Sequence, residues 1–213
     1  MDWGDFIDTV RDDWPEILIA VQEHLYLSFI SILIGILISV PAGIIISRLK
    51  KIAEFVIGIT AVFQTIPSLA LFGFLLPVLG IGTTPAIIAL TVYALLPILR
   101  NTYTGIIGVD ESLIQAGKGM GMTSNQILWK IELPLALPII MAGIRTATVL
   151  TIGVATLATF IAAGGLGDII YRGLSTINNE LVLAGAIPAA LLAILFDAIL
   201  RGIEKMVTPK GLK

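Results

Sequence analysis

The chain has 213 residues, of which 57% are hydrophobic and 13% charged, and its formal net charge is −2. This composition excludes an ordinary soluble domain, and the absence of cysteine excludes disulfides, thiolate metal sites and a cysteine nucleophile. Several apolar runs reach about 20 residues, the length that crosses a bilayer. The chain is therefore predicted to be an all-α integral membrane protein, with no nucleic-acid partner.

The N-terminal arm, residues 1–20, has an amphipathic pattern. Apolar residues from Trp3 to Trp14 recur at helical spacing, and most of the aspartates lie on the other side. The acidic start also lacks the basic region of a signal peptide. These features predict a short helix in the outer membrane interface, with tryptophan at headgroup depth. Contact with an extracellular partner is the alternative.

Five apolar segments follow, at 25–47, 52–81, 84–99, 139–162 and 181–203. An unbroken helix over the second would exceed a hydrocarbon core of ~30 Å, so it is one span kinked at Pro67 or two short spans. If the segment 52–81 is counted as one span, only Arg11 and Arg172 of the 13 basic residues lie on the outer side. The positive-inside rule thus favours five spans, with the N-terminus outside and the C-terminus, including Lys210 and Lys213, in the cytoplasm.

A segment of mixed polarity, 110–138, interrupts the hydrophobic pattern between the third and fourth spans. Acidic and serine residues at 110–112 favour the start of a short helix that a glycine turn ends. Thr123 starts a second short helix, and Pro134 is expected to end it. Such an element suits docking on another protein, whereas an amphipathic loop packed on the protein's own surface is the alternative.

The spacing in this segment resembles the coupling motif of ABC-importer permeases, E-A-A-x3-G-x9-I-x-L-P, which docks on a cytoplasmic ATPase. The residues that carry it here are Gln115, Ala116, Gly117, Gly119, Gly121, Ile131, Leu133 and Pro134. Gln115 replaces the usual Glu and loses its charge, and Gly117 replaces the second Ala. Small residues at 116–121 are expected to let the partner approach closely, and Leu133-Pro134 to transmit its movement to the next span.

Other stretches are similar to osmoprotectant-uptake permeases for glycine betaine, carnitine and choline, namely 23–28, 64–70, 96–105, 138–146, 164–168 and 207–212. The resemblance implies a five-helix fold of the methionine-importer type, that of the type I ABC importers, in a bacterial cell membrane. It also implies a second, identical or paralogous permease, two ATPase subunits that bind ATP and Mg, and a separate extracellular binding protein. The chain itself is then expected to be no enzyme and to bind no cofactor or metal.

Polar side chains inside the spans are candidates for lining a translocation pathway, because charges buried there are costly. They are Gln64, Thr65, Pro67, Ser68, Tyr93, Thr148, Thr151 and Thr159. Helix–helix packing is the alternative for the threonines. At the outer end of the fourth span, Gly164, Gly165 and Gly167 form either a flexible outer gate or an ordinary loop.

Three further patterns point to no chemistry of their own. The glycines at 117–121 follow no strand and lack the P-loop pattern, so this chain is not expected to bind ATP. His24 is predicted to lie at the headgroup interface rather than on a metal, and Asp197 and Arg201, four residues apart, predict a structural ion pair. Alternative functions are the same importer with an amino acid as its cargo, an ATP-independent transporter or channel, and a non-transporting scaffold.

Overall fold

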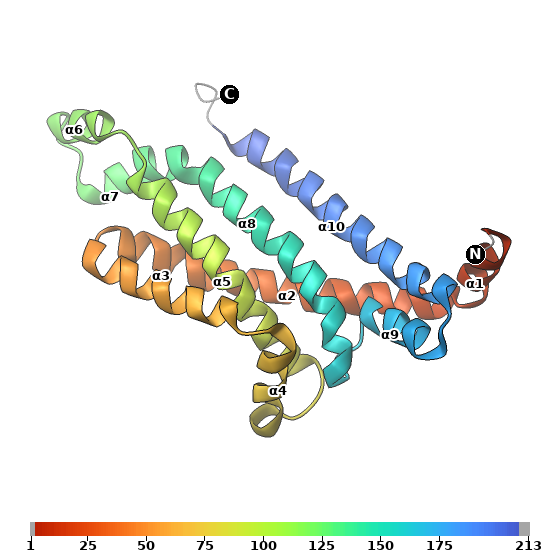
Figure 1. Cartoon of the computed structure of the whole chain (residues 1–213). Coiled ribbons are helices and arrows are strands. Elements are labelled where there is room, and N and C mark those ends of the chain that lie inside the picture. The colour runs from red at the N-terminus through yellow and green to blue at the C-terminus, as the bar shows by residue number, and fades with distance from the viewer. Residues whose placement is uncertain (1–2, 209–213) are drawn as a thin grey trace.

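The computed structural model describes residues 3–208, so the predicted positions of Lys210 and Lys213 lie outside the described residues. The described part is entirely helical (Figure 1). Its elements in chain order are α1 (Trp3–Asp12), α2 (Trp14–Ser47), α3 (Lys50–Thr65), α4 (Ser68–Leu79), α5 (Thr83–Ile107), α6 (Glu111–Gly119), α7 (Ser124–Ile127), the π-helical turn η1 (Leu128–Glu132), α8 (Leu133–Ala155), the 3-10 turn η2 (Thr156–Ile161), α9 (Leu166–Thr176) and α10 (Asn179–Val207).

Four helical stretches among the described residues are long and apolar enough to cross a membrane: α2, α5, the continuous stretch Ser124–Ile161 that contains α8, and α10. A fifth crossing exists if α3 and α4 count as one span. These two helices meet at 95°, at a break next to Pro67. Ile66 is extended there because a proline disfavours the helical conformation of the residue before it. The break lies where a kink is predicted, and the bend is close to a right angle.

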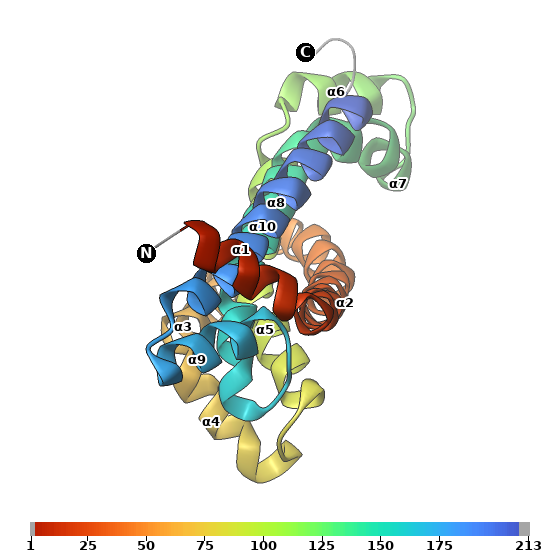
Figure 2. The ribbon, with the colours of Figure 1, turned by 90° about the vertical axis from the view of Figure 1, so that its right-hand side faces the viewer.

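The centre of the bundle is a close packing of α2, α5 and α8, and α10 covers α8 from outside (Figures 1 and 2). Glycines allow the close approach. A Cβ at Gly43 of α2 would lie 2.6 Å from the Thr102 Cβ on α5, and one at Gly143 of α8 would lie 2.7 Å from the Pro97 carbonyl oxygen. Larger residues at these positions would force the helices apart.

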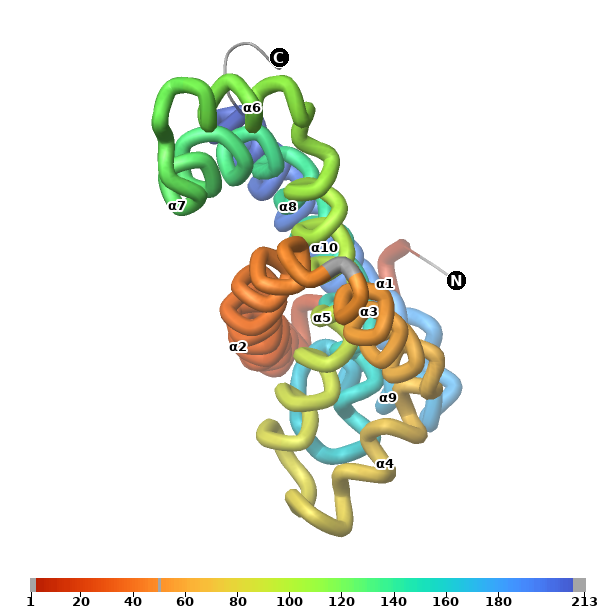
Figure 3. The backbone as a smooth tube through the Cα atoms, turned by 90° about the vertical axis from the view of Figure 1, so that its left-hand side faces the viewer, coloured from red at the N-terminus to blue at the C-terminus, as the bar shows by residue number. Residues whose placement is uncertain are grey.

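The bundle has two distinct ends. At one, called the α6–α7 end, these two short helices project beyond the long helices, near the last turns of α10 (Figures 1 and 3). At the other, called the α9 end, lie α1, α9 and the turn between α4 and α5, where the Gly82 N–H donates to the Ile161 carbonyl at 2.8 Å. Regions that are distant in the sequence thus converge at each end.

The N-terminal helix is shorter than the predicted arm of residues 1–20. It ends at Asp12, and α2 begins at Trp14 with a proline in its first turn, a position where the missing N–H has no helical partner to lose. Arg172 of α9 donates to Asp13 at 2.8 Å and also pairs with Glu16. These contacts fix the junction of α1 and α2 against α9.

Candidate coupling and translocation site

The helix α6 starts at a well-formed cap. The Asp110 carboxylate accepts from the Ser112 N–H at 2.8 Å, and this hydrogen bond holds the pKa of the Asp110 carboxyl below its ordinary value. One turn on, the Gln115 amide donates to Glu111 at 2.7 Å. A glutamate at 115 would instead face a like charge at 111. Gln115 in place of the motif glutamate therefore has a local cause: the amide bonds to Glu111, whereas a second carboxylate would repel it.

A tight turn joins α6 to α7. Gly121 adopts φ +78°, and the N–H groups of Gly121 and Met122 donate to the carbonyls of Lys118 and Gly117 at 2.9 and 3.1 Å. This is the pattern of a Schellman motif, whose left-handed residue is usually glycine. Thr123 then begins α7 in a reciprocal capping box with Gln126. The turn has a defined geometry rather than being a flexible loop.

Gly117 does not share the exposed surface expected for the small residues at 116–121. It is buried, and a Cβ there would lie 2.9 Å from the Cδ1 atom of Ile131 and 3.4 Å from Ile127. Ala116, Gly119 and Gly121 are exposed, and a Cβ at either glycine would meet nothing within 4 Å. The small size of Gly117 thus serves the packing of α6 on η1, and its role in coupling stays a prediction.

Large apolar side chains are exposed on the α6–α7 end. Met120 is 74% and Trp129 65% exposed, and Leu113 is exposed as well. The sequence interpretation did not select these residues, although an apolar side chain in a polar segment is the signal that would have found them. Exposed apolar groups on a projection beyond the bundle are typical of a protein–protein contact.

The connection to α8 differs from the prediction that Pro134 ends a helix. The helix is continuous from Ser124 to Ile161. Pro134 lies in the first turn of α8, just after the π turn η1, where a proline is tolerated. Leu133 packs against the core of α5 and α8. The α6–α7 projection is thus joined to a membrane helix without an intervening loop.

One ion pair ties this connection to the end of α2. Glu132, in η1, is 3% exposed at its side chain, and the half-exposed Arg48 guanidinium binds it through both terminal nitrogens, with Nη1 2.9 Å from Oε1. A bidentate pair of this kind fixes both position and orientation. Glu132 is the unspecified position of the I-x-L-P motif, so the motif gave no reason to select it.

The break between α3 and α4 brings two predicted pathway residues together. The Gln64 amide donates to the Tyr93 carbonyl at 3.3 Å, and the Tyr93 hydroxyl donates to the carbonyl of Ile66. Thr65 instead donates to its own helix, at Val62. Ser68 and Pro67 flank the break but share no hydrogen bond with this pair. Tyr93 therefore fixes the bent conformation from α5.

The predicted threonines of the fourth span lie on its inner side. Thr148 and Thr151 are fully buried, and Thr148 donates to the Ile144 carbonyl at 2.8 Å. Neither side chain reaches an open surface in this conformation, so their pathway role stays a prediction, as does that of the half-buried Thr159. The exposed hydroxyl of α8 is Thr146, which the sequence interpretation passed over.

The three glycines of the predicted outer gate make specific contacts. Gly164 and Gly165 adopt φ +83° and +94°, and the Gly165 N–H donates to the Glu23 carboxylate at 2.8 Å. A Cβ at Gly167 would collide with the Thr156 carbonyl oxygen. The segment is held against α2 and η2, which differs from a freely flexible loop.

His24 lies inside the protein, which corrects its predicted position at the headgroup interface. Its side chain is fully buried, and Nε2 is 3.0 Å from the Ile152 carbonyl oxygen of α8. The segment 162–165 covers it, with a Cβ at Gly165 reaching 3.3 Å from Nδ1. Burial arises because the segment that leads into α9 lies over His24 of α2, which no local pattern reveals.

The described residues form a bundle of membrane-length helices with a projecting pair of short helices, and the second of these continues into α8. This arrangement fits the membrane subunit of a transporter that a partner protein moves, and the comparison with known families gives the class. Residues 25–209 match the family of binding-protein-dependent transport system inner membrane components. The chain belongs to this family and is the permease subunit of an ABC importer.

Similar proteins include the glycine betaine/carnitine/choline transport system permease protein OpuCB of Bacillus subtilis (strain 168), 52% identical over 93% of this chain and 91% of the relative. The choline transport system permease protein OpuBB of the same organism is 50% identical over 97% of this chain and 95% of the relative. The inward-facing MetNI methionine ABC transporter is similar in structure, with a TM-score of 0.81, 27% identity and coverage of 91% of this chain and 97% of that one. An amino acid ABC transporter has the same fold, with a TM-score of 0.71, 19% identity and coverage of 94% and 98%.

Proposed function

We propose that this permease imports quaternary-amine osmoprotectants, of the class of glycine betaine, carnitine and choline, in an ATP-driven complex. The named substrates of the similar Bacillus permeases support this cargo. The observation that carries the ATP-driven mechanism is the α6–α7 end: an exposed apolar surface on a projection whose second helix, α7, runs without a break into α8. A partner that moves this surface must also move the membrane helix.

The partner in this proposal is an ATPase that docks on Leu113, Met120 and Trp129. Two copies would serve a pair of permeases, the second identical or paralogous, and each ATPase would bind the ATP and Mg. This chain would hold neither and would catalyse no reaction. Placing the α6–α7 end in the cytoplasm puts Lys118 and Lys130 on the inner side, as the positive-inside rule requires. The α9 end then faces a separate extracellular binding protein.

Solute would pass between the two permeases, with Gln64 and Tyr93 at the α3–α4 break as candidates for contact. A second candidate function is import of an amino acid, which the structural similarity to a methionine transporter favours. An ATP-independent transporter would have no use for a projecting docking surface.

Uptake by the complete complex tests the proposal. The permease, its ATPase and its binding protein are reconstituted in liposomes and given labelled glycine betaine, carnitine, choline or methionine, with and without ATP. We expect ATP-dependent uptake of at least one amine and none of methionine. Methionine uptake would favour the amino-acid alternative, and amine uptake of equal rate without ATP would refute the ATP-driven mechanism.

A further inference from the structure

Four ionisable side chains form a network between α8 and α10, within the membrane-spanning helices. Arg145 of α8 binds two residues of α10: its Nε is 2.9 Å from Asp197 Oδ1, and its Nη1 is 2.8 Å from Glu204 Oε2. Asp197 also accepts from Arg201 at 2.8 Å, which confirms the predicted pair. The two positive and two negative groups balance.

This network is more than is needed to join two helices. The predicted topology places Arg145 on the cytoplasmic side, yet inside a membrane-spanning segment, where ionisable residues are rare and often mark substrate or ion pathways. Apolar contacts would hold α10 on α8 without placing charges there. Arg145 and Asp197 are each about one quarter exposed at their side chains rather than sealed in the core. Both side chains therefore reach the surface of this chain.

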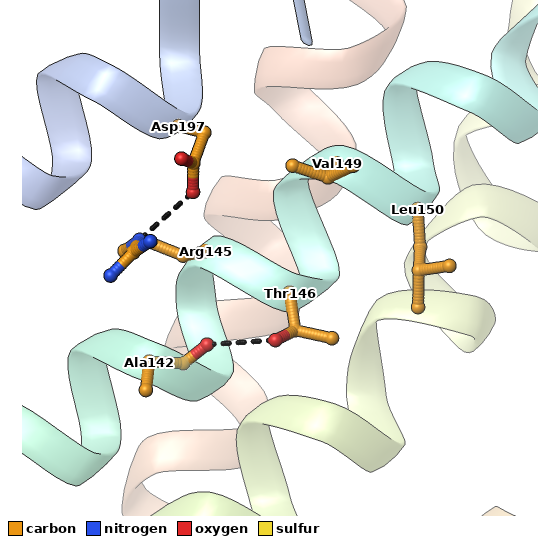
Figure 4. Close-up of a pocket in the computed structure, with 6 residues that line it drawn as sticks. All are labelled: Ala142, Arg145, Thr146, Val149, Leu150 and Asp197. Atoms are coloured by element: carbon orange, nitrogen blue, oxygen red, sulfur yellow. Dashed lines mark hydrogen bonds and ion pairs between the residues drawn. The ribbon is translucent and has the colours of Figure 1, made fainter. Parts of the chain in front are cut away.

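A pocket of about 380 Å³ opens beside this pair, lined by Ala142, Arg145, Thr146, Val149, Leu150 and Asp197. Figure 4 shows Arg145 reaching from α8 toward Asp197 on α10, with Thr146 and Val149 on the same stretch of α8. This volume is within the range of small-molecule sites. The pocket combines one cation, one anion and apolar side chains.

The guanidinium retains unused donors. In the described part of the chain, Nε and Nη1 of Arg145 have carboxylate partners and Nη2 has none. A planar guanidinium end with free N–H groups is suited to a carboxylate, which it can bind in a bidentate way. Beside it, Val149 and Leu150 offer an apolar wall for methyl groups, and Asp197 supplies negative charge.

We propose that this pocket is a solute subsite that recognises zwitterions, with Arg145 binding the solute carboxylate and Val149, Leu150 and Asp197 receiving its methylated cationic end. The subsite rests on the proposed function and deepens it. It separates the osmoprotectant class into two: glycine betaine and carnitine carry a carboxylate, whereas choline carries only a hydroxyl. Arg145 then determines specificity for the former.

Substitution at Arg145 tests this in the reconstituted complex. Arg145→Gln keeps a hydrogen-bonding side chain but removes the charge, and we expect betaine and carnitine uptake to fall at least tenfold while choline uptake changes less than twofold. Arg201→Gln is the matched control: Arg201 does not line the pocket, its partner Asp197 faces the cationic end that all three solutes share, and the change should therefore affect uptake of all three equally. Equal loss of the three solutes in Arg145→Gln, or no loss, would overturn the subsite.

A second measurement does not depend on choline being transported. The chain has no cysteine, so Thr146→Cys places a unique thiol at the pocket. We expect betaine to slow its alkylation by a small thiol reagent in the assembled complex, and choline at the same concentration not to. The control Leu191→Cys, on the exposed outer face of α10, should show no protection. Absence of protection by betaine overturns the subsite, whereas absence of amine uptake by the wild-type complex overturns the proposed function.

Discussion

Removing either partner of the Arg48–Glu132 pair should destabilise the permease unequally. Arg48→Gln leaves the Glu132 carboxylate, 3% exposed, without its counter-ion, and an unpaired buried charge costs about 3–5 kcal/mol. Glu132→Gln leaves Arg48, whose side chain is 48% exposed and can be solvated by water. The free energy of unfolding should therefore fall by about the value of a surface ion pair, about 1 kcal/mol. The expected difference between the two variants is therefore about 2–4 kcal/mol.

The double variant Arg48→Gln with Glu132→Gln removes both charges and should be more stable than Arg48→Gln alone. Denaturant titration of the detergent-purified permease, followed by tryptophan fluorescence, measures the unfolding free energies; Trp129 lies three residues before Glu132. The double-mutant cycle isolates the coupling between the two side chains. If Glu132→Gln were as damaging as Arg48→Gln, or if the two effects simply added, the assignment of this pair as a buried link would be refuted.

Three further outcomes are expected. Gly121→Glu should leave membrane insertion intact but uncouple ATP hydrolysis from uptake, because φ +78° is strained for any other residue; unchanged uptake would count against the coupling role. Trp129→Ala should weaken ATPase binding by about 2 kcal/mol, as at an interface hot spot, while Phe55→Ala, an equally exposed aromatic on α3, should not. Gly167→Val should reduce folded yield and expose the α9 segment to protease, whereas Gly153→Ala, with open space around it, should be tolerated.

Local patterns predicted those features that depend on neighbours along the chain. The break at Pro67 follows from a missing N–H and a restricted preceding residue, and the Asp197–Arg201 pair from one helical turn. The polar interruption at 110–138 stands out because the membrane excludes such composition elsewhere. In each case the physical cause lies within a few residues of the effect.

The features that the sequence did not reveal depend mostly on contacts between elements. The sequence did not indicate that Arg145 contacts α10, because tertiary packing determines which faces of two helices meet. His24 and Gly117 were assigned to surfaces, yet the segment 162–165 covers His24 and η1 packs on Gly117. Pro134 was interpreted as a helix end because a π turn that accommodates a proline has no clear sequence pattern. Tertiary packing decided the positions of Arg145, His24 and Gly117, whereas that of Pro134 depends on the adjacent turn η1.

The two ends of α8 are held differently, and this suggests how docking at α6–α7 reaches the Arg145 pocket. At the α9 end, Gly167 packs on η2 and the α4–α5 turn bonds to Ile161, which fixes the end of the helix. The continuous helix from Ser124 to Ile161 has 38 residues, which at 1.5 Å each is a rod of about 57 Å. If the end of α2 moves with η1, to which Arg48 ties it through Glu132, and the helix pivots at Ile161, a displacement applied at Ser124 is reduced to about two-fifths at Arg145, in proportion to its distance from the pivot. A shift of several ångströms by an ATPase would then move the Arg145 guanidinium by more than the tolerance of a hydrogen bond. The same rod would thus open and close the carboxylate site without any movement at the α9 end.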